Sequence, residues 1–267
     1  MPRPRRALEI FLSVGVSAGV MGAAIQAPQA LAQHGHHPGQ HNAQILAQGG
    51  EGGEGGEGGQ AAAARSDLDV QVVLAQMQGH LLVAQELLRQ RQFSAAEPHV
   101  DHPVDELYGA LVPALQRRQI PPFLATLEEL RQQVRLNPSA PSTALKLAKA
   151  QQAIAAVTQA FPGPGAPQAP MVQGIVRQLA QTAVNEYSAA VAGNQVVEVI
   201  EYQDARGFLL EAQQLLNNAI AREPAAARGL KSEQQTIAAM LKAFPSVKPP
   251  SKAVMAPVQL QQLQKQL

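Results

Sequence analysis

Apolar residues recur at helical spacing from residue 67 onward. Between residues 68 and 91 they fall three or four positions apart, on one face of a helix: Val70, Val73, Leu74, Met77, Leu81, Ala84 and Leu88. Ser66 or Asp67 is suited to cap the start of this segment. The pattern therefore predicts a long amphipathic helix.

Prolines divide the next hundred residues into shorter helical segments. We expect a loop around residues 93–102, then a helix from Pro103 to about residue 118, since proline fits the first helical position and acidic residues follow it. Pro121 and Pro122 are expected to open another helix, which Pro138 or Pro141 ends. An alanine-rich helix that ends at Ala160 completes this part of the chain.

Residues 161–170, with four prolines and two glycines, interrupt the helical pattern. Helical spacing resumes at Val172 and predicts a helix that ends near Gly193 and Asn194, a pair suited to a left-handed cap or a turn. Two more helices are predicted at residues 197–222 and at about 230–244. The prolines that follow predict the end of the fold.

These segments together predict an all-α protein, an antiparallel helical bundle over residues 67–245. Its halves, at about 67–160 and 171–245, each place a long helix before a short connection and a second helix. Tandem helical hairpins also allow a tetratricopeptide-like arrangement, although no regular repeat period follows. Residues 246–267 are expected to form a Pro/Gln-rich tail.

The first 66 residues have a different composition. Residues 1–32 have the pattern of a signal peptide, because arginines precede an apolar run and Ala30-Leu31-Ala32 forms a small-residue cleavage site. We therefore expect a periplasmic or secreted protein with no membrane span after cleavage. Residues 33–66, rich in His, Gly and Glu, have almost nothing to bury, which predicts a disordered linker.

Composition argues against several classes of function. A formal net charge of +1, no tryptophan and few other aromatic residues provide neither a basic surface nor stacking platforms for nucleic acid. The absence of cysteine removes both disulfides and a thiol nucleophile, and we find no serine elbow or glycine-rich phosphate loop. We therefore expect that the protein is not an enzyme.

Histidines and acidic residues gather where the first predicted helix meets the loop and helix that follow. His80, His99, His102 and Glu106 offer nitrogen and oxygen ligands for iron, copper or zinc if the two helices fold back on each other. The same residues also fit a structural role, with His102 at a helix start and Glu106 near the positive end of its dipole. Both interpretations stay open.

Two further groups could bind a cation. Glu198 and Glu201 are neighbours on one helix surface, where they would receive a metal ion or pair with Arg206. The predicted linker holds a second, unstructured group of imidazoles suited to copper, nickel or zinc: His34, His36, His37 and His41.

Short motifs in the second half carry a resemblance to a known family. Glu186-Tyr187, residues 192–196 and Glu201-Tyr202 with Phe208 resemble the soluble extracytoplasmic helical region found beside some bacterial high-affinity iron permeases. This similarity covers about residues 182–216. It implies periplasmic biology linked to iron.

A fainter resemblance concerns the histidine-rich part of the first half. Residues 79–80 and 99–108 resemble secreted imelysin-like iron-uptake proteins, which carry a His-x-x-Glu motif. Here the motif is absent, because the position of its glutamate is occupied by Val83 after His80 and by Asp105 after His102. The resemblance therefore transfers no ligand site.

Two functions fit these observations. One is an exported metal-binding or metal-delivery protein linked to iron uptake, which requires distant histidines and carboxylates to converge. The alternative is a periplasmic helical module that binds another exported protein without a metal, and that requires an exposed apolar groove.

Overall fold

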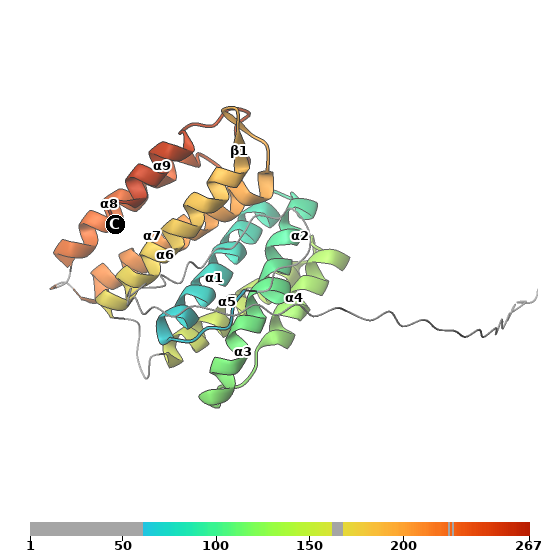
Figure 1. The fold of residues 1–267 in the computed structure, drawn as a ribbon. Helices are drawn as coiled ribbons and strands as arrows, with labels where there is room; N and C mark the ends of the chain where they lie inside the picture. Colours follow the sequence, from blue (N-terminus) through green and yellow to red (C-terminus); the bar gives the residue numbers. More distant parts are fainter. Residues whose placement is uncertain (1–60, 162–167, 224, 226) are drawn as a thin grey trace, which may run out of the picture. The chain divides into compact units, whose positions relative to one another are not determined.

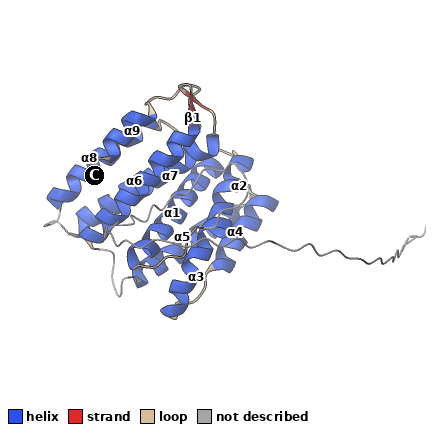
Figure 2. Ribbon diagram, viewed as in Figure 1, coloured by secondary structure: helices blue, strands red, loops and turns tan. Residues whose placement is uncertain are grey.

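A computed structural model describes residues 61–161, 168–223, 225 and 227–267 of the chain, all within the unit Ala47–Leu267 (Figure 1). The predicted signal peptide and most of the predicted linker, with its four histidines, lie outside the described residues. Helices make up most of what is described (Figure 2), which confirms the predicted all-α class. None of the described helices is long and apolar enough to cross a membrane.

The N-terminal half begins with α1 (Asp67–Arg89), close to the bounds that its apolar pattern predicted. Ser66 caps this helix: its hydroxyl accepts from the backbone N–H of Asp69, and the Asp69 carboxylate accepts from the backbone N–H of Ser66. Three further helices follow: α2 (Phe93–His102), α3 (Tyr108–Arg117) and α4 (Leu124–Leu136). The half ends with α5 (Pro141–Ala160).

The predicted loop at residues 93–102 is wrong, since this stretch is α2. It continues without a break through a π-helical turn (Pro103–Leu107) into α3. The buried face of α2 carries His99 and His102 where an ordinary amphipathic helix has apolar residues, so its periodicity is not visible in the sequence. π-Helical turns are rare and frequently occur at functional sites.

The C-terminal half consists of α6 (Ala169–Ala190), a short hairpin of β1 (Val191–Ala192) and β2 (Gln195–Val196), α7 (Val199–Arg222) and α8 (Ala227–Met240). A 3-10 turn (Leu241–Ala243) follows α8. Gly193 and Asn194 have φ angles of 55° and 63°, which is the left-handed turn that their sequence predicted.

The prediction that the fold ends at the prolines after Phe244 is wrong. Residues Pro257–Gln264 form α9, which packs on α6 and α8 and buries Leu260 completely. The hydroxyl of Tyr187 on α6 donates to the carbonyl oxygen of Met255, 2.7 Å away. This helix has few apolar residues of its own, so its place depends on the bundle that it covers.

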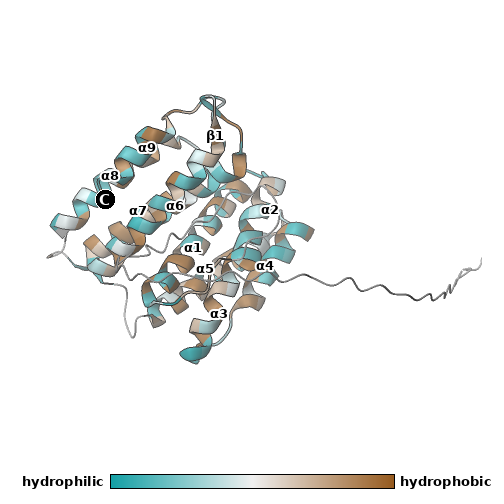
Figure 3. Cartoon of the chain, in the orientation of Figure 1, coloured by the Kyte–Doolittle hydropathy of each residue, from teal (hydrophilic) through white to brown (hydrophobic). Residues whose placement is uncertain are grey.

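Helix α1 lies between the two halves (Figure 1). It packs against α2, α3 and α5 on one side and against α6 and α7 on the other. Leu74 and Met77 belong to the core of the N-terminal half, while Val72 and Ala75 belong to that of the C-terminal half. Apolar and polar stretches alternate along the ribbons (Figure 3). Because α1 is buried on most of its surface, it contributes side chains to both hydrophobic cores.

Candidate metal centre

Helices α1 and α7 cross at two glycines. A Cβ atom placed on Gly207 would lie 2.5 Å from the carbonyl oxygen of Gly79 and 2.8 Å from a methyl carbon of Val83. No larger residue fits between the two backbones. The close crossing brings the neighbouring side chains of His80 and Asp204 into contact.

Three imidazoles surround the carboxylate of Asp204. Nδ1 of His80 and Nδ1 of His99 each lie 2.8 Å from Oδ1, and Nδ1 of His102 lies 3.3 Å from Oδ2. The four side chains are buried, with His99 fully enclosed and His102 the most exposed at 9%. The structure therefore unites the three histidines predicted from the sequence around a carboxylate that was not in the predicted set.

Burial and charge act in opposite directions on this cluster. Desolvation lowers the pKa of His80, and the attraction of Asp204 does not fully offset it. Burial alone would raise the pKa of Asp204, but the surrounding imidazoles outweigh that effect and hold its pKa well below the ordinary value. A carboxylate that stays ionised and an imidazole that favours its neutral form are the states in which these groups bind metal ions.

The second ring nitrogen of His99 is held by Gln203. Nε2 of His99 lies 2.8 Å from Oε1 of Gln203, and Nε2 of Gln203 donates to the carbonyl oxygen of Val247 at 3.1 Å. A metal-binding histidine commonly has such a partner on its outer nitrogen.

Glu106 lies at the solvent-facing edge of the cluster. Its Oε1 is 3.8 Å from Nε2 of His102, and its side chain is about one-third exposed. Both residues belong to the continuous helix of α2, the π-helical turn and α3, with His102 directly before the turn and Glu106 inside it. Glu106 therefore lies beside His102 at the edge of the cluster and is not among the groups that surround Asp204.

Sequence comparison adds an independent finding. Residues 166–267 match the model of the iron permease-associated 4-helix bundle domain. The comparisons with curated proteins and with solved structures gave no match. The match confirms the predicted resemblance to the iron permease helical region and extends it from residues 182–216 to all of α6, α7, α8 and α9.

The matched region, residues 166–267, supplies Gln203 and Asp204 to the cluster, whereas the histidines come from α1 and α2. All seven histidines of the chain precede residue 103. The candidate site thus lies where the matched region meets the rest of the chain. The fainter resemblance to imelysin-like proteins stays a prediction.

The other two predicted ligands, Glu198 and Glu201, are not part of the metal-ligand group found among the described residues. Glu198 is exposed directly before α7, and Glu201 is buried on α7 one turn before Asp204. The metal-ligand group found among the described residues contains His80, His99 and Asp204. Arg206, expected beside Glu198 and Glu201, contacts Glu86 of α1 at 2.5 Å.

Asp204 could have been identified from its position. It lies one turn before Phe208, on the face of α7 that the sequence predicted to be buried. A carboxylate at a core position of an amphipathic helix requires a polar partner. This position therefore indicates a site residue more strongly than membership of an acidic stretch does.

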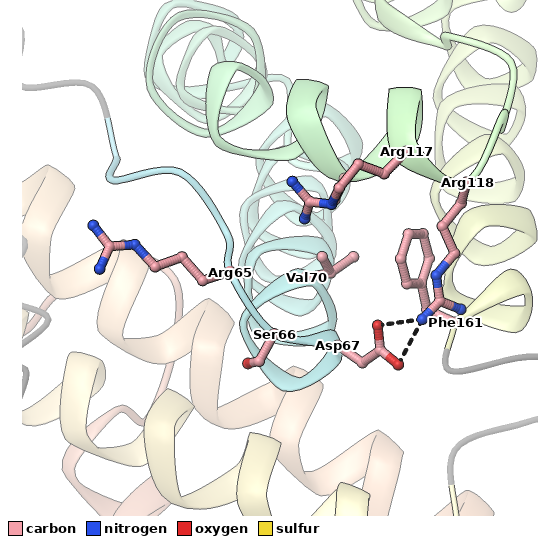
Figure 4. Close-up of a pocket in the computed structure, with 8 residues that line it drawn as sticks. Arg65, Ser66, Asp67, Val70, Arg117, Arg118 and Phe161 are labelled. Carbon is pink, nitrogen blue, oxygen red and sulfur yellow. Dashed lines mark hydrogen bonds and ion pairs between the residues drawn. The ribbon is translucent and has the colours of Figure 1, made fainter.

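A separate hollow of about 340 Å³ lies beside the start of α1 (Figure 4). Arg65, Arg117 and Arg118 line it together with Asp67 and Phe161. The Arg118 guanidinium donates to both carboxylate oxygens of Asp67, at 2.7 and 2.9 Å, and lies over the Phe161 ring. This hollow is not the apolar groove that a protein-interaction module requires.

Proposed function

We propose that the protein binds a transition-metal ion at His80, His99, His102 and Asp204, and that it takes part in iron uptake outside the cytoplasm. The observation that carries this proposal is the convergence of three imidazoles on one buried, ionised carboxylate. The match of residues 166–267 to the iron permease-associated domain supports iron as the ion.

The donor set fits a divalent ion of intermediate softness. Imidazole nitrogens suit iron, zinc, copper and nickel, and the carboxylate adds an oxygen ligand and a compensating charge. In a tetrahedral site with metal–nitrogen distances of about 2.0–2.1 Å, neighbouring ligand atoms lie about 3.3 Å apart. The observed separations of 2.8 and 3.3 Å from Asp204 require only a small opening of the cluster.

Either a proton or a metal ion can lie between each Nδ1 atom and the carboxylate of Asp204. Each Nδ1 atom either donates a proton to the carboxylate or gives its lone pair to a metal ion. An ion would therefore replace the protons that hold the cluster together, and its binding would release them. A site of this kind can take up and release its cargo without a large change in the fold.

A metal titration with a matched control tests the proposal. Calorimetry of the full chain with anaerobic Fe²⁺, and separately with Zn²⁺ and Cu²⁺, should show one ion bound in the folded region. Asp204→Asn should weaken that binding by at least the roughly 10–100-fold loss typical of an outer-shell partner. Glu198→Gln, which removes an exposed carboxylate outside the cluster, should leave it unchanged.

The linker histidines are present in all three proteins, so their contribution is common to the three titrations. If the wild type and Asp204→Asn bind the same ions with the same affinity, the folded site is rejected. The linker would then account for the binding observed.

A further inference from the structure

Gln203 has a fixed orientation in the fold. Its side chain is buried, with 2% exposure, and its Nε2 donates to the carbonyl oxygen of Val247. Because a backbone carbonyl can only accept, the amide nitrogen must face Val247 and the amide oxygen must face His99. The amide oxygen can only accept as well, so Nε2 of His99 must carry a proton.

We propose that Gln203 is a positioning residue that holds this proton on Nε2 of His99 and thereby assigns Nδ1 of the same ring to the metal ion. The inference rests on the proposed function and adds to it the residue that selects the ligating atom. A neutral imidazole has one protonated nitrogen and one lone pair. With an ion bound, the proton on Nε2 leaves the lone pair on Nδ1, the nitrogen that faces Asp204; without an ion, Nδ1 donates a proton to that carboxylate.

Solvent cannot accept the proton on Nε2 of His99 in place of Gln203, because His99 is fully buried. The acceptor that orients Gln203 is itself immobilised: Val247 is completely buried and packs with Val83, Leu87 and Ala96 of α1 and α2. Next to it, the carbonyl oxygen of Ser246 accepts from the hydroxyl of Tyr202 at 3.1 Å. The segment after α8 therefore determines which His99 nitrogen faces the metal.

Three variants of the full chain separate positioning from stability. Gln203→Met keeps the length of the side chain and removes the acceptor, while Gln203→Glu keeps an acceptor toward His99. Gln71→Met is the matched control, since Gln71 is also buried and donates to backbone carbonyls, those of Thr158 and Phe161, but has no contact with the cluster.

The readouts are the positions of the His99 ring protons, from ¹⁵N NMR of the histidine side chains, and the affinity for Zn²⁺. In the wild type and Gln203→Glu we expect a proton on Nε2, with and without Zn²⁺, and similar affinities. Gln203→Met should lose the fixed proton and bind Zn²⁺ about 10–100-fold more weakly. Gln71→Met should lower the melting temperature and change neither readout.

A wild-type protein with Zn²⁺ on Nε2 of His99 would overturn the inference, and this measurement needs no variant to fold. So would an unchanged proton position and affinity in Gln203→Met. If the wild type binds no ion at the cluster, the proposed function fails. In that case the metal-free spectra still test the proton position, because Gln203 should hold it there without an ion.

Discussion

Gly79 and Gly207 face each other at a distance that leaves no room for a side chain, and this contact sets the register between α1 and α7. His80 directly follows Gly79, and Asp204 lies one turn before Gly207. The crossing of two helix backbones and the geometry of the candidate metal centre therefore depend on the same pair of residues.

Gly207→Ala should destabilise the protein and weaken metal binding together. The new methyl group would lie 2.5 Å from a backbone oxygen that cannot move independently, so the helices must separate. We expect a loss of roughly 1–3 kcal/mol in the free energy of unfolding, typical of overpacking. Gly229→Ala is the control, since its nearest neighbour would be 3.9 Å away. It should be neutral or stabilising by up to about 1 kcal/mol. Urea unfolding and Zn²⁺ titration measure both effects.

A metal ion bound by the folded cluster should raise the melting temperature. An ion that binds only the folded state adds about 2.7 kcal/mol to the free energy of unfolding when its free concentration is 100 times Kd. Linker histidines would bind the ion in the folded and unfolded chain alike and add no stability. Calorimetric melting with and without Zn²⁺ should show a rise in the wild type that Asp204→Asn lacks; an equal rise in both would assign the effect to other ligands.

Glu211 on α7 should make stability depend on pH. Burial of its carboxyl raises the pKa to about 7 from an ordinary 4.5. Because the folded state holds the proton more tightly than the unfolded state, the stability that this group contributes is complete below about pH 4.5 and is lost as the pH rises toward 7. Glu211→Gln should therefore stabilise the protein by roughly 1–3 kcal/mol at about pH 8 and have little effect at about pH 5. Urea unfolding at the two pH values checks this, and equal effects at both would contradict it.

The packing of α9 predicts a large difference between two of its residues. Leu260 is completely buried, whereas Val258 is 57% exposed. Leu260→Ala should cost about 2–4 kcal/mol of unfolding free energy through the lost contacts and the cavity that remains. Val258→Ala should change it by less than about 0.5 kcal/mol. Equal, small effects in thermal melts would show that α9 contributes little to the stability of the bundle.

The sequence predicted the helices that follow a regular apolar pattern. α1 and α7 have bounds within two residues of those predicted, because each has an apolar face more than 20 residues long. α2 was missed because histidines occupy its buried face, and α9 was missed because it is short and packs on α6 and α8. The spacing of apolar residues within a segment does not predict its contacts with other helices.

The candidate site was predicted only in part. His80, His99 and His102 were recognisable as nitrogen donors close together in the chain, but their common partner lies more than 100 residues further on. The register that brings Asp204 to them depends on a pair of glycines, and no sequence motif marks glycines at a helix crossing. Glu198 and Glu201 looked equally suitable as ligands, because an acidic stretch does not reveal which of its carboxylates meets the histidines of α1 and α2.

Because the cluster is built from two parts of the chain, a protein similar to only one of them does not contain the whole cluster. Residues 166–267, the part with a recognised counterpart, contain the carboxylate but no imidazole. A protein built from that region alone would have to obtain its nitrogen donors elsewhere. The helices that precede this region here bring three imidazoles to its carboxylate, so a likeness in the C-terminal region does not by itself transfer the candidate site.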